Sequence, residues 1–108
     1  MQEQPNLTYI NKLSAGDQQF KKELIKIIKD EFPVEKAMYM ENILNKKYSE
    51  AIQNVHKLKH KISILGLENG YKLAENYEES LKQSPSQDNL HKEFTALLNL
   101  METFITKL

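Results

Sequence analysis

Apolar residues recur at intervals of three and four along nearly the whole chain, and this spacing limits the fold more than any other feature. The clearest run lies near the C-terminus: Leu90, Phe94, Leu97, Met101, Phe104 and Leu108. Such spacing places side chains on one face of an α-helix, whereas a half-buried strand needs strict alternation. Because no alternating stretch stands out, the sequence predicts an all-α protein.

Glycine and proline, three of each, separate the helical stretches. We expect five helices, over about residues 6–14, 17–44, 48–66, 68–83 and 90–108. Pro33 removes one amide donor inside the second stretch and crowds the preceding turn, so we expect one kinked helix there rather than two. The predicted architecture is an up-and-down antiparallel four-helix bundle with a short extra N-terminal helix, formed by residues 1–108 as a single domain.

The composition excludes several classes of protein. Basic and acidic residues number 15 each, and this zero net charge argues against a nucleic-acid-binding domain. The absence of cysteine excludes disulfides, thiolate nucleophiles and cysteine-based zinc sites. No apolar run approaches the roughly 18 residues of a membrane span, and the N-terminus lacks the charged start and apolar stretch of a signal peptide. We therefore expect a stand-alone cytoplasmic protein with no nucleic-acid or membrane partner.

The segment VHKLKHKISILGL, residues 55–67, contains two of the three histidines one helical turn apart. At about 100° per residue, one face of this helix is apolar and is predicted to enter the core: Ala51, Val55, Leu58, Ile62 and Leu65. His56 lies about 140° from the centre of that face, so it is expected to point to solvent. Four other residues share or flank its outward face: Ile52, Lys59, His60 and Ser63.

The surroundings of His56 suggest group transfer rather than an ordinary surface histidine. A neutral imidazole is a competent nucleophile near pH 7. Lys59, three residues further on, places an ammonium where a transferred phosphoryl group would carry negative charge. Because the chain shows no general base, metal cage or glycine-rich phosphate loop, a partner would have to supply the catalytic machinery.

The stretch HKLKH…G, from His56 to Gly66, resembles the H-x-L-K-G signature of histidine phosphotransfer (HPt) domains of multistep His–Asp phosphorelays. These domains carry a further glycine ten residues after the histidine, and Leu58, Lys59, Ser63 and Gly66 fall at the expected offsets. The segment DQQFKKELIKIIKDEFP is similar to the family's first long helix, so the resemblance covers about residues 7–105. It implies that His56 is the phosphoacceptor through Nε2, that Lys59 steadies the phosphoryl group, and that Gly66 fits the helix end.

The resemblance implies a phosphoryl carrier in two-component signalling, not an enzyme. Its expected partners are response-regulator receiver domains and a hybrid sensor histidine kinase. Mg²⁺ and the catalytic residues would belong to the receiver, so we expect no cofactor and no metal on this chain, which we expect to be a monomer. The residues expected to contact the receiver are Ile52, His60, Ser63 and Ile64.

Two departures from the family leave alternatives open. His60 replaces the usual glycine four residues after the acceptor, and Glu78 stands where a glutamine is common. A pseudo-HPt module that docks a receiver or kinase without carrying phosphate is therefore a second hypothesis. His56 and His60, with Glu78 as a third ligand, would also suit a divalent metal, although the motif lacks the glutamate of zinc proteases.

The remaining expectations concern ordinary structural roles. Lys57 and Lys61 are expected to solvate the outer face of their helix, and His91 is expected to face solvent. Phe20, Met38, Met40 and the tyrosines are expected in the core or at its rim.

Overall fold

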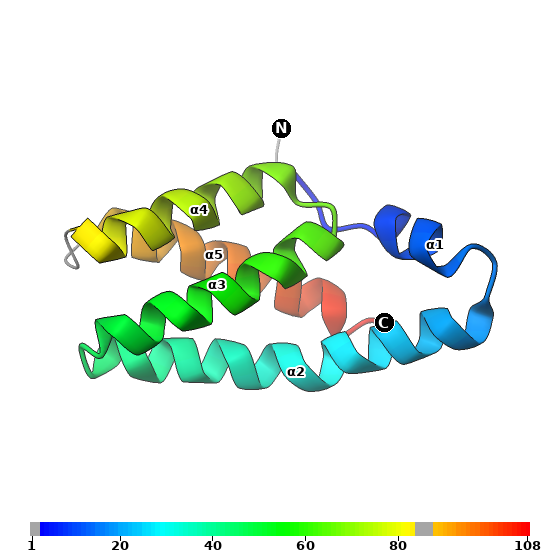
Figure 1. Cartoon of the computed structure of the whole chain (residues 1–108), viewed down its shortest axis with the longest axis horizontal. Helices are drawn as coiled ribbons and strands as arrows, with labels where there is room; N and C mark the ends of the chain where they lie inside the picture. The colour runs from blue at the N-terminus through cyan, green and yellow to red at the C-terminus, as the bar shows by residue number, and fades with distance from the viewer. Residues whose placement is uncertain (1–2, 84–87) are drawn as a thin grey trace.

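The computed structural model describes residues 3–83 and 88–108, which form five α-helices and no strand (Figure 1). The helices are α1 (Thr8–Ser14), α2 (Gln18–Leu44), α3 (Tyr48–Ile64), α4 (Glu68–Gln83) and α5 (Asp88–Ile105). Helices α2 to α5 make an up-and-down four-helix bundle, and α1 is the short extra helix. The predicted fold class is therefore confirmed. In the part of the chain that the structure describes, no helix is both long and apolar enough to cross a membrane.

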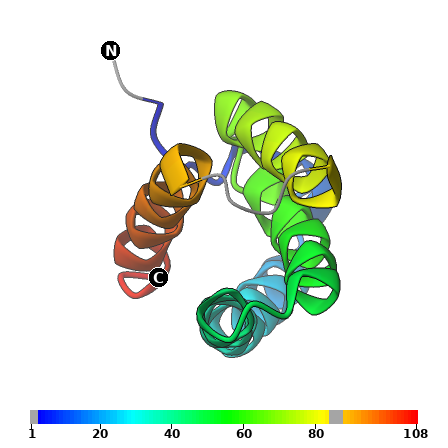
Figure 2. The ribbon, with the colours of Figure 1, turned by 90° about the vertical axis from the view of Figure 1, so that its left-hand side faces the viewer.

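Helix α3 occupies the middle of the arrangement. It packs along α2 on one side and along α4 on the other, whereas α5 contacts α4 and α2 (Figure 2). The predicted core face of α3 is confirmed, since Ala51, Val55, Leu58, Ile62 and Leu65 are all fully buried. The bundle is thus assembled around the apolar side of α3, and the opposite side stays at the surface.

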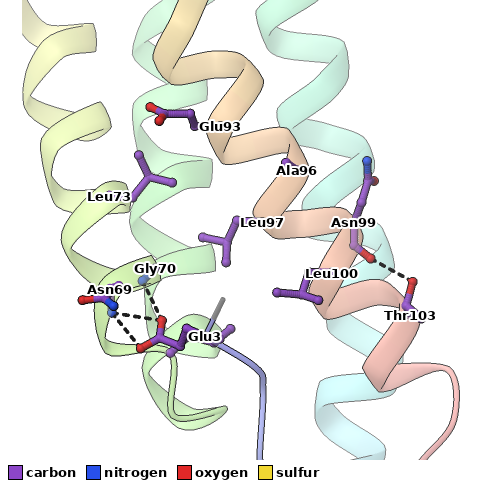
Figure 3. A pocket seen from close by; sticks show the side chains of 11 residues that line it. Glu3, Asn69, Gly70, Leu73, Glu93, Ala96, Leu97, Asn99, Leu100 and Thr103 are labelled. Carbon is purple, nitrogen blue, oxygen red and sulfur yellow. Dashed lines mark hydrogen bonds between the residues drawn. The ribbon is translucent and has the colours of Figure 1, made fainter. Parts of the chain in front are cut away.

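The buried face of α5 differs from the predicted one. Phe94 and Met101 are buried as expected, but the other buried positions are Leu98 and Ile105. Leu97, which was predicted for the same face, is only partly buried. It points toward Gly70 of α4 and lines the groove between the two helices (Figure 3). Helical spacing alone could not show which edge of the apolar stripe would meet the neighbouring helix.

Helix α2 continues through Pro33 as a single helix, as the sequence predicts. The expected places of three of its apolar residues are wrong. Phe20, Met38 and Met40 are 43%, 47% and 37% exposed, because α3 and α5 cover only the face that carries Ile28, Phe32 and Tyr39.

A polar network crosses the bundle interior. The hydroxyl of Tyr39 lies 2.6 Å from that of Tyr77 and 2.7 Å from Nδ1 of His91. His91 is therefore partly buried, and the expectation that it faces solvent is wrong. Burial, together with the bond to Tyr77, raises the pKa of Tyr39 far above its usual value, so both tyrosines remain neutral hydroxyls that satisfy one another's hydrogen-bonding capacity.

The turn between α3 and α4 is a Schellman motif closed by Gly66. Its φ is +76°, and the Gly66 N–H donates to Ser63 O at 3.0 Å while the Leu67 N–H donates to Ile62 O at 3.2 Å. This left-handed conformation is the one that the helix-end position of Gly66 predicts.

The N-terminal segment is tied to the same turn. The Asn6 N–H donates to Leu65 O at 2.8 Å, and the Asn6 side chain lies over Gly66. The Glu3 carboxylate accepts from the N–H groups of Asn69 and Gly70 at the start of α4 (Figure 3). A carboxylate at a helix N-terminus satisfies free amides and complements the helix dipole. The segment thereby holds the α3–α4 turn from outside.

Gly66→Ala is expected to lower the free energy of unfolding by about 2 kcal/mol, against about 1 kcal/mol for Gly16→Ala. Both glycines have positive φ, which disfavours alanine equally. Only at Gly66 would the new Cβ meet a neighbour, since it would lie 2.6 Å from Asn6 Nδ2, whereas Gly16 has open space. Urea denaturation of both variants measures the difference, and equal losses would contradict the role of Asn6.

Candidate functional site

His56 lies on the outward face of α3, with its side chain 55% exposed. Its Nδ1 faces Glu78 Oε2 of α4 at 3.5 Å. A carboxylate on that side favours the neutral tautomer with the proton on Nδ1. The lone pair of Nε2 is then the one available to react with another molecule.

Lys59 lies on the same face but is directed at α4. Its Nζ is 3.1 Å from Glu78 Oε1, and the side chain is only 12% exposed. The ammonium also lies 5.5 Å from the centre of the Tyr71 ring, a distance suited to a cation–π contact. In this state of the protein Lys59 therefore neutralises Glu78 instead of standing free beside His56.

Glu78 of α4 lies next to both His56 and Lys59. Its carboxylate faces His56, Lys59 and, at 3.8 Å, Lys82 one turn further along α4. Burial alone would raise the pKa of Glu78, but Lys59 above all, with smaller contributions from His56 and Lys82, lowers it below the usual 4.5. Glu78 is therefore a carboxylate at neutral pH. His56, Lys59 and Glu78 are called the His56 cluster below.

The four expected partner-contact residues differ in how far they reach the surface. His60 and Ser63 are exposed, whereas Ile52 and Ile64 are partly buried and pack against the core. The rings of His56 and His60 meet edge to face, with centroids 5.1 Å apart. His60 thus covers one side of the His56 imidazole, and the two isoleucines offer only part of their surface to a partner.

The expectation that Lys61 solvates the outer face of α3 is wrong. Its ammonium donates to Glu31 at 2.6 Å and to Glu35 at 3.1 Å, both on α2, and its side chain is 12% exposed. Burial alone would lower the pKa of Lys61, but these two carboxylates raise it. Lys57 remains exposed, as expected.

Neither a metal nor a deep pocket marks the site. Within residues 3–83 and 88–108, no group of three histidine, cysteine or acidic side chains is placed to hold a metal ion. A groove of about 590 Å³ lies between α4 and α5 (Figure 3), and its lining includes no member of the His56 cluster. The cluster presents an exposed imidazole on the outward face of α3, which another macromolecule could approach.

Known proteins offer no direct guide to this chain: no protein-family model, curated protein or solved structure matches it.

Sequence reasoning identified most of this cluster but missed one relation. It expected Glu78 near the acceptor histidine, and the structure brings the two together. It did not reveal that Lys59 would be paired with Glu78. The spacing of acidic residues along α4 gives no signal for this, because several of them are equally polar and only one faces α3.

We expect Glu78→Gln to lower the free energy of unfolding by about 1 kcal/mol at pH 7. Because folding lowers the pKa of Glu78, its carboxylate stabilises the fold above pH 4.5, and this stabilisation is lost as the pH falls further. The difference in the free energy of unfolding between wild type and Glu78→Gln should therefore become smaller from pH 5 to pH 3, as measured by urea denaturation. Glu79→Gln is the matched control, since its side chain is 65% exposed, and a gap independent of pH would contradict the prediction.

Proposed function

We propose that this protein is a phosphorelay intermediate of two-component signalling. In this proposal His56 accepts a phosphoryl group from a receiver-domain aspartate and passes it to another receiver. The observation that carries the proposal is an exposed imidazole whose Nδ1 faces a carboxylate at 3.5 Å. The resemblance of residues 56–66 to the HPt signature gives independent support.

The transfer step follows from this geometry. Nε2 of His56 attacks the phosphorus of the aspartyl phosphate, so that an N–P bond forms while the P–O bond to the aspartate breaks. The aspartate leaves as a carboxylate, and the phosphorylated ring keeps its Nδ1 proton and becomes a cation. Glu78 Oε2, on the Nδ1 side, stabilises that positive charge. The reverse sequence delivers the phosphoryl group to a second receiver.

A carboxylate beside His56 would by itself repel an incoming phosphoryl group. The ammonium of Lys59 lies 3.1 Å from Glu78 and compensates much of this negative charge. Mg²⁺ and the residues that activate the aspartate belong to the receiver in this proposal, so the chain acts as a carrier and not as an enzyme. Receiver domains and a hybrid sensor histidine kinase are its proposed partners, and the cytoplasm is its proposed location.

A docking module that carries no phosphate is the second candidate. The observation that favours it is the edge-to-face contact of His60 with His56, with 5.1 Å between the ring centroids. HPt domains usually have a glycine at the position of His60, where bare backbone lets the receiver close over the acceptor. An imidazole at that point narrows the approach to His56.

The purified chain should be labelled by a phosphorylated receiver with Mg²⁺, or by phosphoramidate through a receiver. ³¹P NMR and intact mass would follow wild type, His56→Gln, His60→Gly and His60→Ala. We expect an acid-labile phosphate on wild type and none on His56→Gln. Removal of the His60 ring should speed labelling several-fold, and His60→Ala separates this effect from the lower helix propensity of glycine.

The outcomes separate the two functions. Label on His60→Gly or His60→Ala, with none on wild type, would identify a docking module that has lost the transfer step. Receiver binding without label on any variant would lead to the same conclusion. A chain that neither binds nor accepts phosphate from a receiver would refute both proposals.

A further inference from the structure

The large apolar side chains that remain exposed are concentrated on two helices. Within the described residues they all come from α1 and α2, and α3, α4 and α5 contribute none: Tyr9, Leu13, Phe20, Ile27, Val34, Met38, Met40 and Leu44. Scattered single apolar residues are normal on a protein surface, but a contiguous set points to an interaction site.

Four of these residues lie on one stripe of α2. Phe20, Ile27, Val34 and Met38 are between 43% and 57% exposed. With Leu24 and Glu31 they follow one another at alternating intervals of four and three residues from Phe20 to Met38. These positions fall within an arc of about 80°, which is the pattern of a coiled-coil seam. The four exposed apolar residues are called the α2 seam below.

The α2 seam is separate from the face of α2 that enters the core. That face carries Ile28, Phe32 and Tyr39, about 100° away around the helix. Helices α3 and α5 lie on the same side of α2 (Figures 1 and 2), and α1 also contacts α2. The four residues of the α2 seam nevertheless remain between 43% and 57% exposed. The bundle therefore uses one apolar face of α2 and leaves a second one uncovered.

The charges beside the α2 seam indicate what would cover it. Glu23, Asp30 and Glu41 are exposed and fall within about 20° of one another along its open edge. Glu31, inside the stripe, is 53% exposed but is already paired with Lys61 of α3 at 2.6 Å, so within the described residues the unpaired charge of this edge comes from Glu23 and Glu41. The basic residue paired on this edge is Lys26, in a solvent-exposed contact with Asp30 at 2.7 Å that contributes little.

This acidic edge argues against a second copy of the chain. In an antiparallel pair of α2 helices the same edges face each other, which would set the acidic residues Glu23, Asp30 and Glu41 of one copy against the acidic edge of the other. A helix with apolar residues at heptad spacing and lysine or arginine beside them would match both the apolar stripe and its charge.

We propose that the α2 seam is a docking site for a basic amphipathic helix of a partner protein. The seam lies on α2, whereas the His56 cluster lies on α3 and α4. The inference therefore does not depend on phosphate transfer.

The test uses two synthetic 21-residue peptides with leucine at the a and d positions of three heptads. One carries lysine at the e and g positions, and the other carries glutamate. Binding of each labelled peptide to the full chain is followed by fluorescence anisotropy at low and high salt. We expect the lysine peptide to bind at least tenfold more tightly than the glutamate peptide and to weaken with salt.

Variants locate the binding site. The double substitution Ile27→Ser and Val34→Ser should lower the affinity for the lysine peptide at least tenfold. Leu44→Ser should change this affinity less than twofold. Leu44 is the matched control, because it is 81% exposed but lies outside the α2 seam. Glu23→Lys, which removes no apolar group, should weaken binding and reduce its salt dependence. His56→Gln should have no effect.

Three results would overturn the proposal. The first is no binding of the lysine peptide. The second is equal affinity for both peptides, or a loss of affinity in Leu44→Ser as large as that in the Ile27→Ser, Val34→Ser variant. The third is a dimer in light scattering that the seam variant dissociates, because a second copy would then cover the α2 seam.

Discussion

The close packing of α3 against α4 is the constraint on which both the bundle and the candidate site depend. A Schellman turn at Gly66, held by Asn6 and followed by the Glu3 cap on α4, sets how the second helix leaves the first. With that turn in place, the apolar side of α3 is enclosed and its outward side faces the carboxylate of Glu78. The N-terminal segment, although remote in sequence, thus contributes to the geometry around His56.

In the proposed relay, the balance of charge at Glu78 governs how easily His56 would accept a phosphoryl group. An unpaired carboxylate beside His56 would oppose the arrival of that group, but Lys59 lies 3.1 Å from Glu78 and compensates its charge. The same carboxylate lies 3.5 Å from Nδ1 of His56, whose side chain is exposed. The ion pair that joins α3 to α4 therefore lies directly beside the proposed acceptor histidine.

Helix α2 shows how a bundle can retain more apolar surface than its own core requires. Its core face supports α3 and α5, while the α2 seam stays exposed beside an acidic edge. A polar network of Tyr39, Tyr77 and His91 crosses the interior from the core face of α2. Such a network gives the helices a specific alignment, since each hydroxyl is satisfied only when α2, α4 and α5 are in register.

The sequence by itself determined the helical fold, the single helix through Pro33, the core face of α3 and the outward direction of His56. These follow from local rules, since residue spacing and proline chemistry act within one helix. Only the tertiary structure decided that Lys59 pairs with Glu78, that Lys61 bridges to α2, that His91 turns inward and that Phe20 and Met38 remain exposed. Each of these depends on which helices become neighbours and at what rotation, and helical periodicity carries no information about either.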